Sequence, residues 1–168
     1  MSYSHRALRN HMFQLRQHEL DKLFSTLPSQ TEAEDTPQGT YKGALMAIAG
    51  VQHLPRKVGA LVYRLLSTPL NPWRGKTFSA DEGANVWFSA QGFLRFGRFH
   101  STSSEQGLEL DYSAIQDDIP VNPEILRGIR GEARFLQNGV WLARMRWQRD
   151  AQNPSTRTTL LYFVLWQE

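Results

Sequence analysis

Short apolar runs separated by turn residues dominate the chain from residue 73 onward, at intervals of roughly ten residues. This spacing predicts short antiparallel strands, as in a sandwich or a barrel. With one earlier run, the predicted strands number eight: 41–48, 73–79, 85–90, 93–100, 108–113, 129–137, 140–149 and 157–167. Eight antiparallel strands can close on themselves, which leaves no free edge and an interior wide enough for side chains or one small ligand.

Two other segments have helical periodicity. Apolar residues at helical steps from Leu8 to Leu27 predict one N-terminal helix that ends before Pro28. A second stripe after Pro55 predicts a short amphipathic helix of a size that could cover the end of the sheet. Its apolar members are Val58, Leu61, Val62, Leu65 and Leu66. The fold class that we expect is therefore mainly β, with an N-terminal helix and a helix between the first two strands.

Length, charge and composition limit the remaining possibilities. A chain of 168 residues forms one domain, in which we expect a helix and linker over 1–38 and the barrel over 39–168. The 15 Arg and 4 Lys are spread along the chain, so we expect no nucleic-acid partner. No apolar stretch reaches the roughly 20 residues of a membrane span, and we expect a cytoplasmic protein without a transmembrane segment. The absence of cysteine removes thiolate nucleophiles and thiolate-bound zinc.

The dipeptide Asn138-Gly139 is the strongest turn signal, because both residues tolerate the positive φ of a two-residue hairpin. With Gln137 opposite Val140, alternation would place one set of side chains on a common face: Arg130, Glu132, Arg134, Leu136, Trp141, Ala143, Met145 and Trp147. The opposite face would hold Gly131, Ala133, Phe135, Leu142, Arg144 and Arg146. Either face could point into the barrel.

Two short motifs resemble a known family. Gly39-Thr40-Tyr41-Lys42-Gly43 is similar to the GxWxG opening of lipocalin-like (calycin) barrels, with Tyr in place of Trp. Trp73-Arg74-Gly75-Lys76-Thr77-Phe78 resembles the WxGKxF segment of a family of uncharacterised bacterial GxWxG-type proteins. The resemblance implies a closed barrel with a ligand cavity. The distal histidine of haem-binding nitrobindins has no counterpart here, so we expect no haem, and we expect no other cofactor or metal.

Alternation and the resemblance together predict a cavity lined by aromatic and guanidinium groups. Guanidinium forks bind carboxylates bidentately, while indole and phenol rings supply apolar walls. The expected lining residues are Tyr41, Trp87, Arg98, Tyr112, Arg130, Arg134, Trp147 and Tyr162. The function that follows is binding of a small amphipathic or acidic apolar molecule.

Three alternatives remain open. The Arg and Trp face could instead point outward, since unpaired buried charge is costly and Arg stems pack well over rings. The barrel could be an isomerase, cyclase or hydrolase that uses Tyr112 with an arginine or with a carboxylate such as Asp111 or Glu132. The basic N-terminal helix could also dock a partner or a membrane surface. The run 158–166 is apolar on both faces, so we expect the first helix to cover its outer face; otherwise this stripe would form a homodimer surface.

Overall fold

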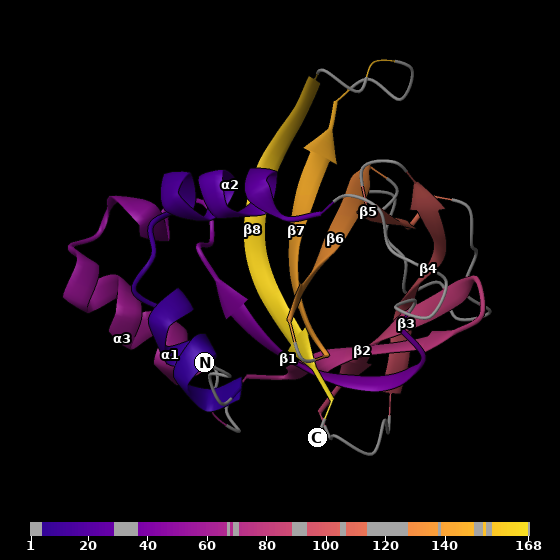
Figure 1. The fold of residues 1–168 in the computed structure, drawn as a ribbon, viewed down its shortest axis with the longest axis horizontal. Helices are drawn as coiled ribbons and strands as arrows, with labels where there is room; N and C mark the ends of the chain where they lie inside the picture. Colours follow the sequence, from indigo (N-terminus) through magenta and orange to yellow (C-terminus); the bar gives the residue numbers. More distant parts are fainter. Residues whose placement is uncertain are drawn as a thin grey trace.

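The computed structural model describes residues 5–28, 37–66, 68, 71–88, 94–104, 107–113, 128–137, 139–149, 153 and 156–167. Its centre is a closed barrel of eight antiparallel strands in sequential order (Figure 1). β1 pairs with both β2 and β8, which closes the barrel and confirms the expected fold class. The strands are β1 (Gly39–Met46), β2 (Trp73–Ser79), β3 (Glu82–Trp87), β4 (Leu94–Ser104), β5 (Gly107–Asp111), β6 (Ile129–Gln137), β7 (Val140–Gln148) and β8 (Arg157–Trp166).

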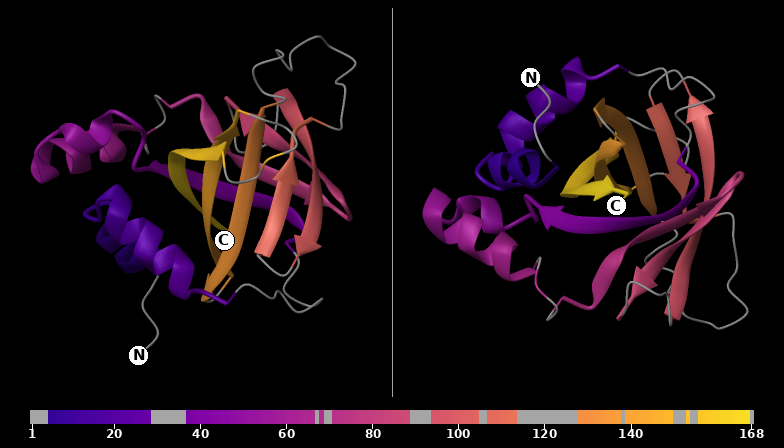
Figure 2. Two further views of the ribbon diagram at one scale, coloured as in Figure 1. Left: turned by 90° about the horizontal axis from the view of Figure 1, so that it is seen from above. Right: turned by 60° about the horizontal axis from the view of Figure 1, so that its bottom comes forward.

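Three helices lie outside the barrel, next to β1 and β8 (Figure 2). α1 (His5–Met12) and α2 (Gln17–Thr26) precede β1, and α3 (Arg56–Leu66) follows a single 3-10 turn, η2 (Val51–His53), between β1 and β2. None of these three described helices has the length and apolar character needed to cross a bilayer. In the sequence, Pro120 and Pro123 indicate a long connection before the strand predicted at 129–137, and this segment lies outside the described residues.

The N-terminal helix is two helices, where the periodicity predicts one. The break comes before α2, where the backbone N–H of Arg16 donates to Glu19 Oε2 at 2.7 Å. This hydrogen bond satisfies a free donor at the start of α2. The bend lets Phe13 and Phe24, one on each side of it, be buried against the outside of the barrel.

The strands support two separate apolar cores. An inner core fills part of the barrel, and an outer core lies between the barrel and the helices. β8 serves both, because Phe163 and Leu165 belong to the inner core whereas Tyr162 and Val164 belong to the outer core. This arrangement confirms that both faces of β8 are covered, one of them by the N-terminal helices.

The hairpin between β6 and β7 closes with Gln137 opposite Val140 as expected, but a register shift follows immediately. Phe135 pairs with Trp141, so Leu136 is an extra residue in β6. The shift corrects the expected faces: Gly131, Ala133 and Phe135 share the inner face with Trp141, Ala143 and Met145. Arg134, Arg144 and Arg146 therefore share the outer face.

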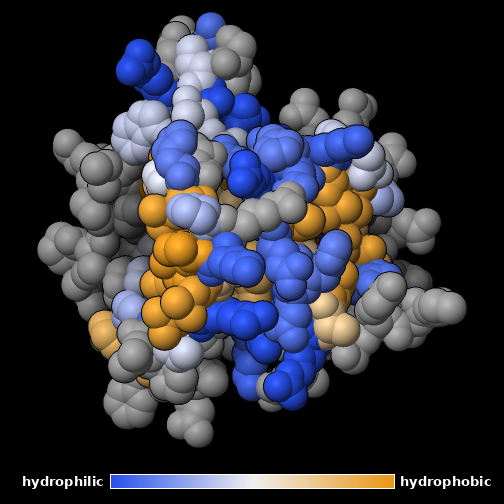
Figure 3. Space-filling model, turned by 90° about the vertical axis from the view of Figure 1, so that its left-hand side faces the viewer, coloured by the Kyte–Doolittle hydropathy of each residue, from blue (hydrophilic) through white to orange (hydrophobic). Residues whose placement is uncertain are grey.

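α3 does not cover the end of the sheet with its apolar stripe. Val58, Leu61 and Leu65 are 44%, 57% and 53% exposed, respectively. The buried anchor is Tyr63, whose hydroxyl accepts a hydrogen bond of 2.8 Å from the N–H of Ile48. This contact turns the helix so that Leu61 and Leu65 face outward while Leu66 packs against the outer side of the barrel, on a side of the molecule where apolar and polar groups lie next to each other (Figure 3).

β4 also differs from expectation at its end. Residues 101–104, which lie between the strands predicted at 93–100 and 108–113, continue β4 and pair with β5 as far as Ser104 opposite Gly107.

Candidate functional site

One half of the barrel interior is hollow. A cavity of about 270 Å³ lies among residues contributed by the ends of several strands. Its walls are almost entirely apolar, and two amide side chains supply the polar groups. The lining residues are Leu45, Asn71, Trp73, Asn85, Trp87, Gly97, Ile129, Met145, Leu161 and Phe163.

Aromatic rings pack the other half of the interior. Phe78 makes edge contacts with Tyr41 and Phe99, with ring centroids 5.6 and 5.5 Å apart. Phe99 in turn contacts Tyr112 at 5.3 Å, and Phe135 meets Trp141 at 5.4 Å. Edge contacts of this kind stabilise a core beyond the area that they bury. The rings leave the hollow half as the part of the barrel that can admit another molecule.

A lysine lies at the boundary between the two halves. Lys76 is fully buried, and its Nζ donates hydrogen bonds to Asn85 Oδ1 at 2.6 Å and to the Tyr112 hydroxyl. The same Nζ lies 4.8 Å from the centroid of the Phe99 ring and 5.2 Å from that of Phe163. Among the described residues, no carboxylate pairs with it. Asn85 and Phe163 also line the cavity, so the amine lies directly behind the cavity wall.

Burial controls the protonation of this group. Because the barrel interior solvates a cation poorly, burial lowers the pKa of Lys76 to about 7. Burial also raises the pKa of the Tyr112 hydroxyl well above its ordinary value, although a hydrogen bond with Asn85 partly opposes this shift. Near neutral pH a large fraction of Lys76 is therefore the neutral amine, next to a protonated phenol.

A β-bulge turns Lys76 inward. Trp73 pairs with Trp87 and Gly75 pairs with Val86, so Arg74 is an extra residue in β2. If the same residues alternated regularly from Trp73, with no bulge, Gly75 would point into the barrel and Lys76 would point outward. Gly75 is needed at this point, because its φ is +144° and a Cβ would lie 2.0 Å from the carbonyl oxygen of Tyr41.

Asn85 connects the lysine to the cavity. Its Oδ1 accepts hydrogen bonds from Lys76 Nζ and from Trp73 Nε1, the latter at 3.1 Å. Its Nδ2 donates to the carbonyl oxygen of Gly97 at 3.2 Å. Gly97 is itself an extra residue in β4, since the register shifts between Ala84 and Asn85. Two bulges therefore flank the polar group at the inner end of the cavity.

The eight residues expected to line a cavity lie in different places. Trp87 lines the cavity. Tyr112 contacts Lys76, and Tyr41 packs within the aromatic half. Trp147 is half-buried at the end of the barrel, where its ring would meet a Cβ on Gly128 at 2.8 Å.

The three expected arginines contact protein groups. Arg98 forms an ion pair with Glu82 at 2.8 Å. Arg130 pairs with Asp111 at 3.0 Å. Arg134 Nη1 donates to the carbonyl oxygens of Phe24 and Leu27 at the end of α2, at 2.9 and 3.0 Å. A cation suits that position, because carbonyls at a helix C-terminus carry partial negative charge.

Tyr162, the eighth residue, points outward to α2. Its hydroxyl donates to Asp21 Oδ1 at 2.5 Å. Burial and the Asp21 carboxylate both raise the pKa of Tyr162 well above its ordinary value. This contact attaches β8 to α2.

The carboxylates considered for catalysis also lie away from the cavity. Asp111 is paired with Arg130, as described above, and Glu132 lies on the outer face within a cluster of arginines. Glu132 contacts Arg144 at 2.6 Å, and both Arg146 and Arg157 at 3.2 Å. Burial by itself raises the pKa of Glu132, but Arg144 and Arg146 more than compensate and hold it below its ordinary value.

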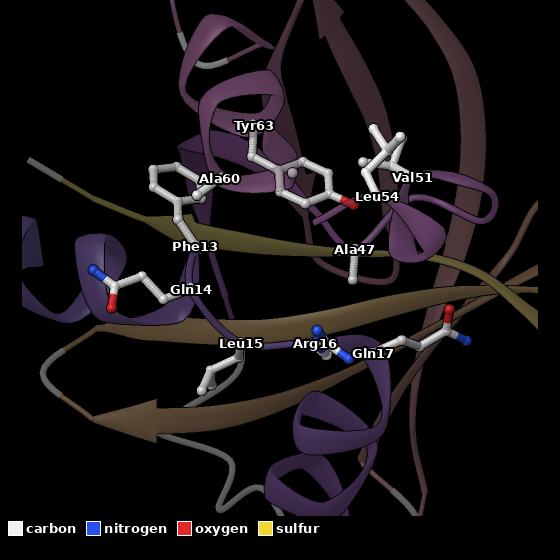
Figure 4. A pocket seen from close by; sticks show the side chains of 11 residues that line it. Phe13, Gln14, Leu15, Arg16, Gln17, Ala47, Val51, Leu54, Ala60 and Tyr63 are labelled. Carbon is white, nitrogen blue, oxygen red and sulfur yellow. The ribbon is translucent and has the colours of Figure 1, made fainter. Parts of the chain in front are cut away.

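A second, smaller cavity lies between the helices. Its side chains come from the segment between α1 and α2 on one side and from η2 and α3 on the other, with Phe13 and Tyr63 among them (Figure 4). The cavity measures about 30 Å³, and one water molecule occupies about that volume in the liquid. It is too small for an organic ligand.

Sequence reasoning did not include Lys76 and Asn85 in the site. The useful signal is the glycine between Trp73 and Lys76, since a glycine inside a strand often marks a bulge. A bulge at that position makes residues three apart share the inner face, which places Trp73 and Lys76 together.

No protein-family model and no curated protein matches the chain. A crystal structure of a protein from Thermomonospora curvata is similar to it, with 17% sequence identity and a TM-score of 0.49. The similarity covers 90% of this chain and 87% of that chain.

Proposed function

We propose that this protein binds one small, mainly apolar molecule with a polar end inside the barrel. The observation that carries the proposal is the cavity itself, whose apolar walls end at the amide of Asn85 with Lys76 behind it. Ligand sites typically combine apolar walls with a few placed polar groups. The resemblance of residues 39–43 to the opening motif of calycin barrels supports the same function.

The cavity volume restricts the size of the ligand. An engineered apolar cavity of about 150 Å³ binds benzene, and drug-sized molecules occupy roughly 300–1,000 Å³. At about 270 Å³, this cavity fits a molecule with a single ring or a short chain.

The polar groups determine how the ligand is oriented. Asn85 can exchange a hydrogen bond with an oxygen of the ligand, and Lys76 can act through Asn85 or supply a positive charge. A carboxylate would favour the protonated lysine, because an opposite charge nearby raises the pKa of an amine. The polar end therefore points inward, and the apolar body contacts Trp73, Trp87 and Met145.

Isothermal titration calorimetry with benzyl alcohol and benzoate tests this proposal. We expect saturable binding of at least one of them, and an increase in unfolding free energy of about 2.7 kcal/mol at a hundred times the Kd. Met145→Trp fills the cavity and should abolish binding, whereas Leu61→Trp on the exposed face of α3 should not change it. Circular dichroism would verify that both variants fold.

Two results would contradict the proposal. One is that neither compound, at millimolar concentration, gives a heat of binding or raises the free energy of unfolding. The other is undiminished binding by a folded Met145→Trp protein, which would place the ligand elsewhere.

A further inference from the structure

We propose that Lys76 is a covalent carbonyl site, at which the amine forms a reversible imine with a small apolar aldehyde held in the cavity. The inference rests on the proposed function, since the cavity must first admit the apolar body of the ligand. It adds the chemical class of that ligand and a reaction.

The surroundings of Lys76 favour this role over a structural one. The side chain is fully buried, and its amine contacts a neutral amide, a phenol and aromatic rings. Burying an amine without a carboxylate opposes folding. An apolar side chain would pack against Phe99 and Phe163 without that penalty, so packing alone does not explain the lysine.

The geometry places the amine within reach of the cavity. Asn85 both lines the cavity and accepts the hydrogen bond from Nζ at 2.6 Å. Phe163 also lines the cavity, and its ring centroid lies 5.2 Å from Nζ. One hydrogen bond therefore separates the amine from bound ligand, so the proposed reaction requires the Asn85 side chain to rotate away from Nζ when the aldehyde binds.

The reaction is balanced without an oxidant or a reductant. The lone pair of the neutral amine attacks the carbonyl carbon, a C–N bond forms, and a proton moves from nitrogen to the carbonyl oxygen. The C–O bond of this carbinolamine then breaks, water leaves, and a C=N bond forms. The Tyr112 hydroxyl, which contacts Nζ, is placed to relay the proton in both steps. Hydrolysis reverses the sequence.

The protonation of Lys76 supports the mechanism, because only the neutral amine is nucleophilic. Lysines that form Schiff bases in proteins are often desolvated in this way. With a pKa of about 7 against about 10.4 for an ordinary lysine, the fraction of neutral amine at pH 7 is about a thousandfold larger.

Reductive trapping tests the proposal. The full-length protein would be incubated at pH 7 with benzaldehyde and sodium cyanoborohydride, which reduces an imine to a stable secondary amine. Intact-mass measurement and peptide mapping would then locate the benzyl group. We expect labelling of Lys76 at least tenfold faster than that of Lys22, Lys42 or Lys57.

Matched variants define the site. Lys76→Met should remove the fast-labelled position, whereas Lys57→Met, at an exposed position of α3, should retain it. Tyr112→Phe, which removes the proposed proton relay, should slow the labelling of Lys76. If Lys76→Met does not fold, protection of Lys76 by saturating benzyl alcohol in the unaltered protein provides the same information.

The outcomes separate the two proposals. Binding of benzyl alcohol with Lys76 labelled no faster than the surface lysines would overturn the carbonyl site and leave the proposed function intact. Fast labelling of Lys76 that is unaffected by both Met145→Trp and benzyl alcohol would support the amine chemistry and contradict binding in the cavity.

Discussion

Because Lys76 is buried, we expect an unusual pH dependence of stability. In the folded protein the pKa of Lys76 is about 7, whereas in the unfolded chain it is about 10.4. Between these values the unfolded chain binds one more proton than the folded protein, so raising the pH favours folding. This contribution is complete above about pH 10.4 and is lost as the pH falls through about 7.

The change of unfolding free energy with pH follows from the pKa shift of Lys76. A full proton difference changes the free energy of unfolding by about 1.4 kcal/mol per pH unit. Between pH 7.5 and 9.5 the total is about 2–3 kcal/mol. Tyr112 is the titratable group that contacts Lys76, and its raised pKa keeps it protonated over this range.

Urea unfolding followed by circular dichroism at several pH values would measure the effect. We would compare the unaltered protein with Lys76→Met and Lys57→Met at one ionic strength. The contributions of other titrating groups to the free energy of unfolding then cancel in the differences. We expect the unaltered protein to gain stability over Lys76→Met as the pH rises, and Lys57→Met to run parallel to the unaltered protein. Parallel curves for the unaltered protein and Lys76→Met would refute the reasoning, because they would mean that folding does not change the pKa of this lysine.

Three further predictions concern the fold. Glu132→Gln should lower the free energy of unfolding by about 3–5 kcal/mol in urea titrations, because it leaves a cluster of partly buried arginines without their shared carboxylate. Glu109→Gln, at a more exposed ion pair, should lower it by at most about 1 kcal/mol. Equal losses for the two variants would contradict this reasoning. Gly75→Ala should prevent cooperative thermal unfolding, because the new Cβ would overlap the backbone of β1. Gly59→Ala in α3 should instead raise the free energy of unfolding by about 0.5–1 kcal/mol. A normal melting curve for Gly75→Ala would exclude the bulge. Deletion of residues 1–28 should cause aggregation in size-exclusion chromatography, because it uncovers the outer core; a monomeric product would instead favour a helix that docks elsewhere.

The barrel could be predicted from the sequence because its signals are local. Alternation and turn residues identified all eight strands, and β2 and β6 begin and end where the patterns predict. The need to cover both faces of β8 followed from its apolar residues alone. These features depend on neighbours along the chain, which a sequence displays directly.

The faces and the site could be predicted only in part, because bulges interrupt alternation. The extra residue Leu136 changes which side chains of β6 share a face with those of β7. The extra residue Arg74 likewise puts Lys76 on the inner face of β2, together with Trp73. The direction of α3 depends on one tertiary hydrogen bond, from Ile48 to Tyr63, which its apolar spacing does not encode. Long-range geometry thus determined which residues surround the cavity.

The bulge in β2 also separates the shape of the strand from the chemistry of the interior. A chain one residue shorter at Arg74 would restore simple alternation, and Trp73, Lys76 and Phe78 would all remain on the inner face. A bulge bends its strand and increases the local twist. A single codon deletion could therefore straighten β2 while leaving the interior amine in place.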